Sequence, residues 1–302
     1  MKKSVSLLLA GLMLCGALTG CGSSNDSANY GEGGESQTTE SGETAGTTGA
    51  IHVVSREDGS GTRGAFVELT GVEDDNGDNT TVDAEIANRT DAVLTTVAGN
   101  EAAIGYVSLG SLNDTVKAVK VDGVEATVEN VKSGDYTLSR PFNIATKGEP
   151  TGVAKDFINF ILSADGQAIV EEENYIKVDD AAPAFTSDGS SGQIAVGGSS
   201  SVSPVMEKLI EAYKAVNPNA KIELQTSDST SGMTGAMDGT FAIGMASREL
   251  KDEEAAELTG TAIALDGIAV IVNTANTVEN LTMDQIRSIY VGETTDWADV
   301  AA

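Results

Sequence analysis

The sequence predicts an α/β fold built from two lobes. Short apolar runs typical of strands alternate with stretches typical of helices, as in proteins that cover a sheet with helices. Residues 51–302 are long enough for two packed lobes, and the 40% apolar composition is normal for a globular protein. Four turns rich in serine, threonine and glycine follow the expected strands, and these turns carry the functional signal.

The first twenty residues predict export from the cytoplasm. Lys2 and Lys3 precede an apolar run over residues 5–14, which is shorter than a membrane span and typical of a cleaved signal over residues 1–20. The residues that end at Cys21 resemble the bacterial lipobox, so we expect a lipid on Cys21 and an extracytoplasmic protein anchored to the cell membrane. An ordinary secretory signal with an incidental cysteine is the alternative.

Residues 21–50 predict a flexible tether between the membrane and the fold. They are almost entirely small or polar, and such a composition buries too little apolar surface to offset the entropy of ordering. Cys15 leaves with the signal and Cys21 is lipidated, so we expect no disulfide and a fold that rests on its own core.

The first hydroxyl-rich turn, residues 55–63, is suited to hold an oxyanion. It lies between the expected strand at residues 51–54 and a helix-like stretch. Its glycines let several N–H groups converge, and the helix adds unpaired N–H groups and the positive end of its dipole. Arg56 can supply a bidentate guanidinium, and Ser60 and Thr62 can donate hydroxyl protons.

Three further turns repeat this pattern, over residues 197–204, 226–232 and 244–247. Ser203 is expected to cap the helix after the first of them, with Pro204 at the first helical position. Ligands of α/β folds lie outside the carboxyl ends of strands, so we expect the turns to meet at one site. Neutral hydroxyls and N–H groups with one arginine can offset the desolvation of a buried dianion.

The net charge of −28 argues against nucleic acid and anionic lipid as partners. It does not exclude a bound anion, because carboxylates beyond the Debye length of about 8 Å are largely screened at physiological salt. Local donors therefore decide the affinity for an anion, and the overall field mainly slows encounter.

Other chemical signals are weaker. Residues 59–64 fit the glycine pattern of dinucleotide-binding turns, but the first glycine lies several residues beyond the apolar run. Residues 74–85 have part of the spacing of a calcium loop, but Asn79 occupies the position that needs glycine. His52 is the single histidine, and the sequence has no nucleophile elbow, so we expect no enzyme, cofactor or metal site.

Five segments of the chain are similar to one family, namely residues 55–66, 198–204, 243–250, 265–273 and 280–290. In these segments the chain resembles the extracytoplasmic phosphate-binding proteins of ABC transporters, the PstS type. The resemblance covers essentially everything after the tether. It implies a two-lobed, type II periplasmic-binding-protein fold whose lobes close on the ligand.

The resemblance also implies which residues bind the anion. The implied phosphate site comprises Arg56, Ser60, Gly61, Thr62, Ser200, Ser201, Ser229 and Ser247. Ser247 stands where some members place an aspartate that accepts the proton of hydrogen phosphate, so the preference among phosphate, sulfate and arsenate stays open. Asp228 stands where some members carry a small residue, and it either restores that acceptor or faces solvent.

The predicted function is a lipid-anchored receptor that captures inorganic phosphate between its lobes and delivers it to the permease subunits of an ABC transporter. We expect a monomer that is not an enzyme. A receptor for another tetrahedral oxyanion, such as sulfate, arsenate or molybdate, is the nearest alternative. A surface adhesin, a sensor or an enzyme that reuses the fold is a further alternative, because a fold alone does not establish a function.

The order of the segments differs from that of the family. Residues 51–178 resemble the later half of the family sequence and residues 193–302 the earlier half, while residues 179–192 have linker composition. We interpret this order as a circular permutation, which proteins tolerate where the old termini are near each other and exposed. A truncated tandem gene is the competing explanation.

The permutation implies how the lobes are assembled. Lobe one is expected over residues 141–267, and lobe two over residues 51–140 together with residues 268–302. The hinge crossings are then expected at residues 140–144 and 265–269.

Overall fold

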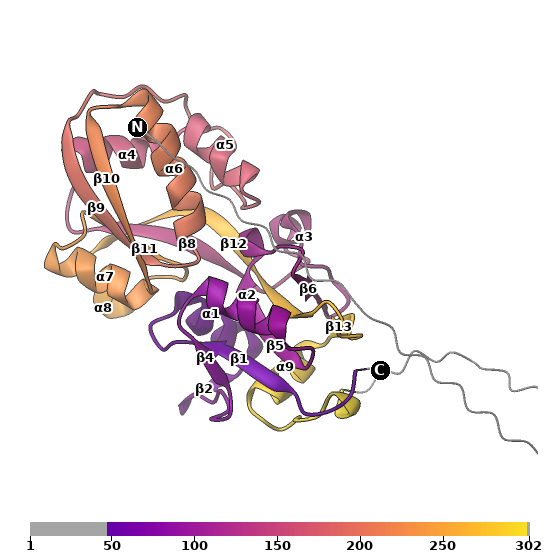
Figure 1. The fold of residues 1–302 in the computed structure, drawn as a ribbon. Coiled ribbons are helices and arrows are strands. Elements are labelled where there is room, and N and C mark those ends of the chain that lie inside the picture. Colours follow the sequence, from indigo (N-terminus) through magenta and orange to yellow (C-terminus); the bar gives the residue numbers. More distant parts are fainter. Residues whose placement is uncertain (1–46, 301–302) are drawn as a thin grey trace, which may run out of the picture. The chain divides into compact units, whose positions relative to one another are not determined.

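The computed structural model describes residues 47–300, and the expected signal, Cys21 and most of the tether lie outside them (Figure 1). Within residues 47–300, no helix combines the length and the apolar character that crossing a membrane requires. The strands of this part of the chain form one extended sheet and two small two-stranded sheets. The extended sheet divides into two halves, which we name lobe one and lobe two.

Lobe two has the strand order β4-β1-β5-β12-β6. β1 (His52–Arg56) pairs in parallel with β4 (Glu85–Ala87) and with β5 (Ala103–Ser108). β12 (Thr259–Asn273) runs antiparallel to both β5 and β6 (Val116–Ala118).

Lobe one has the matching order β10-β9-β11-β8-β12. β9 (Gly192–Ser199) pairs in parallel with β10 (Ala220–Ser227) and with β11 (Ile243–Ala246). β8 (Ser139–Thr146) is antiparallel to β11 and to β12. Each lobe is therefore an α/β sheet with three parallel strands followed by an antiparallel one.

β12 belongs to both lobes. Its residues 259–267 pair with β8, and its residues 268–272 pair with β5. In Figure 1 this strand runs from one lobe into the other beside β8. The lobes are thus joined by two neighbouring extended strands, as the two-lobed type II fold requires.

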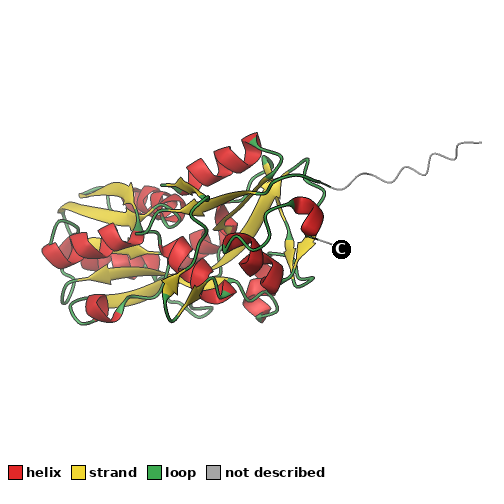
Figure 2. Cartoon of the chain, turned by 90° about the horizontal axis from the view of Figure 1, so that it is seen from below, coloured by secondary structure: helices red, strands yellow, loops and turns green. Residues whose placement is uncertain are grey.

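Helices cover both halves of the extended sheet (Figure 2). The helices of lobe two are α1 (Gly61–Thr70), α2 (Thr90–Gly99), α3 (Val128–Ser133) and α9 (Met283–Tyr290). Those of lobe one are α4 (Gly152–Ile161), α5 (Ala164–Glu172), α6 (Ser203–Val216), α7 (Ser229–Asp238) and α8 (Asp252–Ala255). The remaining elements are β2 (Glu73–Asp74), β3 (Gly77–Asp78), β7 (Lys120–Val121), β13 (Asn280–Leu281), η1 (Leu109–Ser111) and η2 (Trp297–Asp299).

Each lobe has its own apolar core. Phe66 stacks on Tyr106 in lobe two with ring centroids 3.9 Å apart, and Tyr290 closes the same aromatic cluster. In lobe one, Phe157 and Tyr213 lie in a separate core with their ring centroids 5.0 Å apart. Removal of this apolar surface from water stabilises each lobe independently.

The start of α6 differs from the sequence-based prediction. Val202, not Ser203, is the residue before the helix, so Ser203 is already helical and Pro204 follows it within the first turn. The Ser203 hydroxyl donates to the backbone oxygen of Ser199 at 3.1 Å and does not cap the helix. The prediction failed because the helix begins one residue early, so that Ser203 lies inside it and its hydroxyl donates back to the carbonyl four residues earlier.

Residues 179–192 connect α5 to β9 and are hydrogen-bonded to lobe one at several points, among them the buried carboxylate of Asp156. Asp156 accepts hydrogen bonds from the Ser187 hydroxyl at 2.6 Å and from the Asp188 backbone N–H at 3.0 Å. It also accepts from Tyr213 at 2.8 Å and from Asn217 at 3.3 Å. We call this set the Asp156 network, and it ties the connecting segment to α4 and α6.

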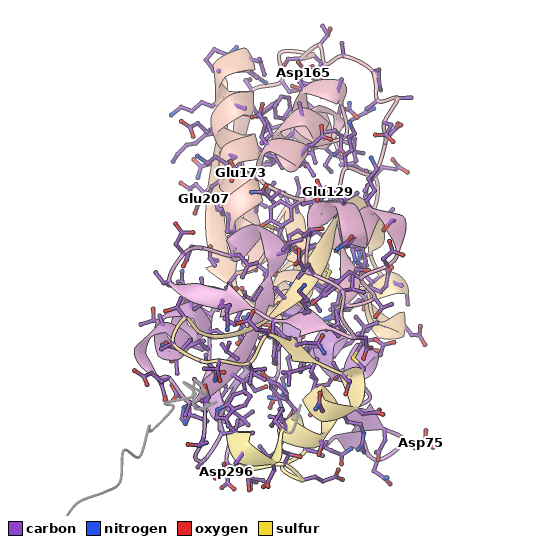
Figure 3. All side chains as sticks on the ribbon, turned by 90° about the vertical axis from the view of Figure 1, so that its right-hand side faces the viewer. Asp75, Glu129, Asp165, Glu173, Glu207 and Asp296 are labelled. Atoms are coloured by element: carbon purple, nitrogen blue, oxygen red, sulfur yellow. The ribbon has the colours of Figure 1, made fainter. Side chains whose placement is uncertain are left out.

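The excess of negative charge lies at the surface of both lobes. The carboxylates labelled in Figure 3 project from several elements along the molecule, among them Asp75, Glu129, Asp165 and Glu207. None of these four side chains has an ion pair with a described residue. These four charges are therefore not neutralised by a neighbouring cation within residues 47–300.

Candidate anion site between the lobes

The four hydroxyl-rich turns meet between the lobes. Each begins where a strand ends, namely β1, β9, β10 and β11. Helices α1, α6 and α7 begin in or just after three of these turns. Their N-terminal ends therefore bring unpaired N–H groups and positive dipole ends to the same region.

Arg56 is the cation of the site and is only 2% exposed. Its guanidinium donates to both carboxylate oxygens of Glu57, with Nε 2.8 Å from Oε2 and Nη2 2.7 Å from Oε1. Nη2 also donates to the hydroxyl of Ser200 in lobe one at 3.1 Å. A bidentate carboxylate thus orients the guanidinium toward the opposite lobe.

The Tyr106 hydroxyl is hydrogen-bonded to the backbone of Arg56. The Arg56 N–H donates to the Tyr106 hydroxyl at 3.2 Å, and Ser55 shares a hydrogen bond with the same hydroxyl at 2.9 Å. Burial raises the pKa of Tyr106 to about 12, so this hydroxyl stays neutral at physiological pH.

Buried hydroxyls surround the guanidinium, and we name them the hydroxyl cluster: Thr62, Thr90, Ser199, Ser200, Ser201, Ser229 and Ser247. Thr62 of lobe two and Ser201 of lobe one share a hydrogen bond of 2.8 Å across the interface. Ser199 donates to Ser247 at 3.0 Å, and the Ser247 N–H donates to the Ser229 hydroxyl at 3.1 Å. The cluster thus joins all four turns.

Gly61 is glycine because the lobes approach each other closely there. A Cβ atom at this position would collide with the Ser229 hydroxyl and would lie 2.9 Å from the Ser247 hydroxyl. The absence of a side chain exposes the backbone N–H groups at the start of α1 to the cluster.

Ser60 lies beside the cluster but has a different partner. Its hydroxyl accepts from the Arg63 N–H at 3.3 Å and so caps α1. Among the residues predicted for the site, the structure therefore brings together Arg56, Gly61, Thr62, Ser200, Ser201, Ser229 and Ser247, with Ser60 adjacent to them.

Asp228 caps α7. Its carboxylate accepts from the Ser231 N–H at 2.8 Å and from the Ser231 hydroxyl, and it lies against Gly59 of lobe two. These bonds hold the partly buried carboxylate at the start of the helix, a capping role that the sequence analysis did not assign to it.

Two members of the hydroxyl cluster, Ser199 and Thr90, were not predicted from the sequence. Ser199 lies in the predicted turn but was not singled out from its neighbours. Thr90 follows β4, a strand of three residues with two exposed side chains, so neither length nor apolar pattern indicated a strand there. The residues Asn88-Arg89-Thr90-Asp91, a polar run before a helix, were the only available signal.

The site carries charges of both signs, because Arg56 is ion-paired with Glu57 and the bordering cavity is also lined by Arg89, Asp91 and Glu207. In residues 47–300, no carboxylate is hydrogen-bonded to the hydroxyl cluster. That part of the chain also contains no group of three or more histidine, cysteine or acidic residues placed to hold a metal ion. A cavity of about 280 Å³ borders the cluster, with Thr90 and Leu94 on one side and Ser200 and Pro204 on the other.

These features define a two-lobed binding protein with an anion site between the lobes. The family model described as "PBP superfamily domain" matches residues 33–165 and 183–302. The chain is 49% identical to "Phosphate-binding protein PstS 2" of Streptococcus agalactiae serotype V, over 99% of this chain and 98% of the relative. It is 46% identical to the protein of the same name in Streptococcus pneumoniae serotype 4, over 83% of this chain and 87% of the relative.

A solved structure agrees. The phosphate-binding protein of a phosphate ABC transporter from Streptococcus pneumoniae TIGR4 superposes with a TM-score of 0.69 at 46% identity, covering 84% of this chain and 100% of that one. The chain therefore belongs to the PBP superfamily and, within it, to the phosphate-binding proteins of the PstS type.

Proposed function

We propose that this protein binds one inorganic phosphate ion between its lobes and delivers it to an ABC transporter. The observation that carries the proposal is the convergence of one buried guanidinium with hydroxyls from both lobes at the ends of four strands. The names of the relatives, which describe phosphate binding, support the same ligand.

The chemistry of the site suits an oxyanion. A buried dianion loses several kcal/mol of hydration or more, so it needs many donors in return. Each charge-assisted hydrogen bond contributes about 1.5–3 kcal/mol. Arg56 supplies charge, while the hydroxyls and N–H groups supply donors that remain neutral when no anion is bound.

We assign the binding roles as follows. Arg56 is the charged partner, and the neutral donors are Ser60, Gly61, Thr62, Ser200, Ser201, Ser229 and Ser247. Closure of the lobes about β8 and β12 then encloses the ion, because donors from both lobes are needed to replace its water.

The test is calorimetric titration of phosphate into residues 21–302. Wild type is expected to bind phosphate one to one at low salt, and Arg56→Ala is expected to weaken binding by at least about 2 kcal/mol. Arg287→Ala is the control, since Arg287 lies on α9 with its side chain 41% exposed and should leave the affinity unchanged. The absence of heat with wild type would overturn the proposal.

A second ligand class has a specific observation in its favour. Ser247 offers a hydroxyl where some relatives place an aspartate, and a hydroxyl does not repel a fully deprotonated anion. Sulfate, arsenate or molybdate could then compete. A titration series with the four anions decides this, because strong phosphate binding without binding of sulfate, arsenate or molybdate would exclude the second class.

We further propose that the protein acts as a monomer, tethered by a lipid on Cys21, beside the permease subunits. The apolar run before Cys21 and the polar tether after it support the anchor. Mass spectrometry of the membrane-extracted protein tests it, since a diacylglyceryl group on Cys21 is expected and an unmodified mature chain would contradict it.

We also propose that the chain is a circular permutant. Ile51 N–H donates to the Thr295 backbone oxygen at 2.8 Å, and Ala50 pairs with Asp296, so both ends of the described chain lie side by side in lobe two. The matching strand orders of the lobes and the pinned segment 179–192 fit a rejoined pair of old termini.

Deletion of residues 179–192 tests this assembly. Under permutation no folded lobe one should remain, because β9 would lose its connection to α5. A tandem transcript from the source genome that encodes two complete copies would overturn the permutation in favour of a truncated gene.

A further inference from the structure

The first residue of α2 lies within the hydroxyl cluster, although its neighbours are at the surface. Thr90 is 6% exposed, whereas the side chains of Arg89 and Asp91 are 53% and 73% exposed. The helix turns this one side chain toward lobe one. A threonine that served only the helix would have no reason to be buried against the opposite lobe.

The Thr90 hydroxyl contacts more of the site than any other hydroxyl of the cluster. It shares hydrogen bonds of 3.3 Å with Ser200 and of 3.3 Å with Ser201, both in lobe one. Arg56 Nη1 donates to it at 3.4 Å. No other side chain among residues 47–300 is hydrogen-bonded to all three of these residues.

These contacts are long. Hydrogen bonds between hydroxyls are usually about 2.5–3.0 Å, so the three contacts of Thr90 are weak. The hydroxyl can therefore redirect its proton to a stronger acceptor with little loss of hydrogen-bond energy. A charged oxygen is such an acceptor. Thr90 has no competing role as a cap, because Arg89 precedes the helix and no side chain caps α2.

We propose that Thr90 is a ligand of the bound phosphate, donating its hydroxyl to the ion directly from the start of α2. This inference rests on the proposed function. It adds a fifth segment to the site, the connection between β4 and α2, and places a donor of lobe two next to the lobe-one serines.

The experiment is titration of phosphate into wild type, Thr90→Val and Thr90→Ser. Thr90→Val removes the hydroxyl at similar shape and is expected to weaken phosphate binding about tenfold, the loss of one hydrogen bond to a charged group. Thr90→Ser is expected to stay within roughly threefold of wild type, because it keeps the donor. Thr95→Val is the matched control, since Thr95 is exposed on the same helix.

A role through Arg56 is distinguished by repeating Thr90→Val in an Arg56→Lys background. A direct ligand loses affinity in both backgrounds, whereas a residue that only positions the guanidinium loses its effect when the guanidinium is gone. Thermal unfolding without phosphate checks that Thr90→Val remains folded.

The outcomes separate the two proposals. Wild type that gives no heat with phosphate overturns the proposed function and this inference with it. Wild type that binds, together with Thr90→Val that binds equally well or loses its effect in the Arg56→Lys background, overturns the inference alone.

Discussion

Asp156 in lobe one and Asp266 in the crossing strand β12 are both buried carboxylates, yet their surroundings shift their pKa values in opposite directions. Burial, the largest influence on both, raises a carboxyl pKa. Around Asp156, hydrogen bonds from Ser187, the Asp188 N–H, Tyr213 and Asn217 together outweigh burial and lower the pKa. Around Asp266, burial outweighs its partners and raises the pKa to about 6.

The comparison shows that an ion pair alone does not keep the pKa of a fully buried carboxyl low. Asp266 faces Arg140 Nη2 at 3.1 Å and accepts from Ser108 at 2.8 Å, and both charged side chains are almost fully buried. Desolvation of two charges can exceed their attraction. Desolvation weighs more heavily on Asp266 than on Asp156, and Asp156 also accepts from several neutral donors.

The largest expected effect comes from breaking the ion pair between Arg140 of β8 and Asp266 of β12. Arg140→Ala should lower the free energy of unfolding by about 3–5 kcal/mol at pH 7, because it leaves Asp266 buried without its cation. Urea unfolding measures this, with Lys132→Ala on the surface as control. A loss below about 1 kcal/mol would mean that Asp266 is already neutral at that pH.

The pH dependence sharpens the comparison. The raised pKa of Asp266 means that the folded protein takes up a proton more readily than the unfolded chain, so this stabilisation is complete below the ordinary value of 3.8 and is lost as pH rises through about 6. The lowered pKa of Asp156 has the opposite sign, with stabilisation present at neutral pH and lost as pH falls below 3.8.

The stability of Asp266→Asn relative to wild type should therefore rise between pH 4 and pH 7, by at most about 3 kcal/mol for a shift of that size. This change adds to a loss at every pH, because the substitution leaves Arg140 buried without its anion. Asp156→Asn should lose stability relative to wild type as pH rises from the acid side. Thermal unfolding across this range measures both slopes. If the stabilities of both variants, relative to wild type, changed with pH in the same direction, the two pKa values would not be shifted in opposite directions.

The smallest effect concerns a single donor of the Asp156 network. Tyr213→Phe should cost about 1.5 kcal/mol, because it removes one hydrogen bond of 2.8 Å to a carboxylate. Tyr290→Phe is the matched control, since that buried hydroxyl donates only to the Val54 carbonyl at 3.3 Å. Equal losses in the two variants, measured by urea unfolding, would show that the carboxylate does not strengthen the bond.

Local chemistry predicted part of the candidate site. Glycines and hydroxyls directly after apolar strand signals indicated Arg56, Ser60 and Thr62, because turn geometry depends mainly on neighbouring residues. Ser200 and Ser229 were indicated by the resemblance to the PstS family. Ser203 and Asp228 were assigned wrong or open roles, since the choice between capping and other partners depends on acceptors a few ångströms away in the folded chain. Thr90 could not be found, because β4 is short and half-exposed.

The sequence by itself determined the α/β class and the chemistry of the hydroxyl-rich turns, because both depend on residue type and on spacing along the chain. Only the tertiary structure decided which hydroxyls lie close together and that β12 pairs in both lobes. It also decided that the pKa values of Asp156 and Asp266 shift in opposite directions. Those properties depend on which residues, remote in the chain, are brought close together in the fold, because burial and hydrogen bonding are set by these spatial neighbours.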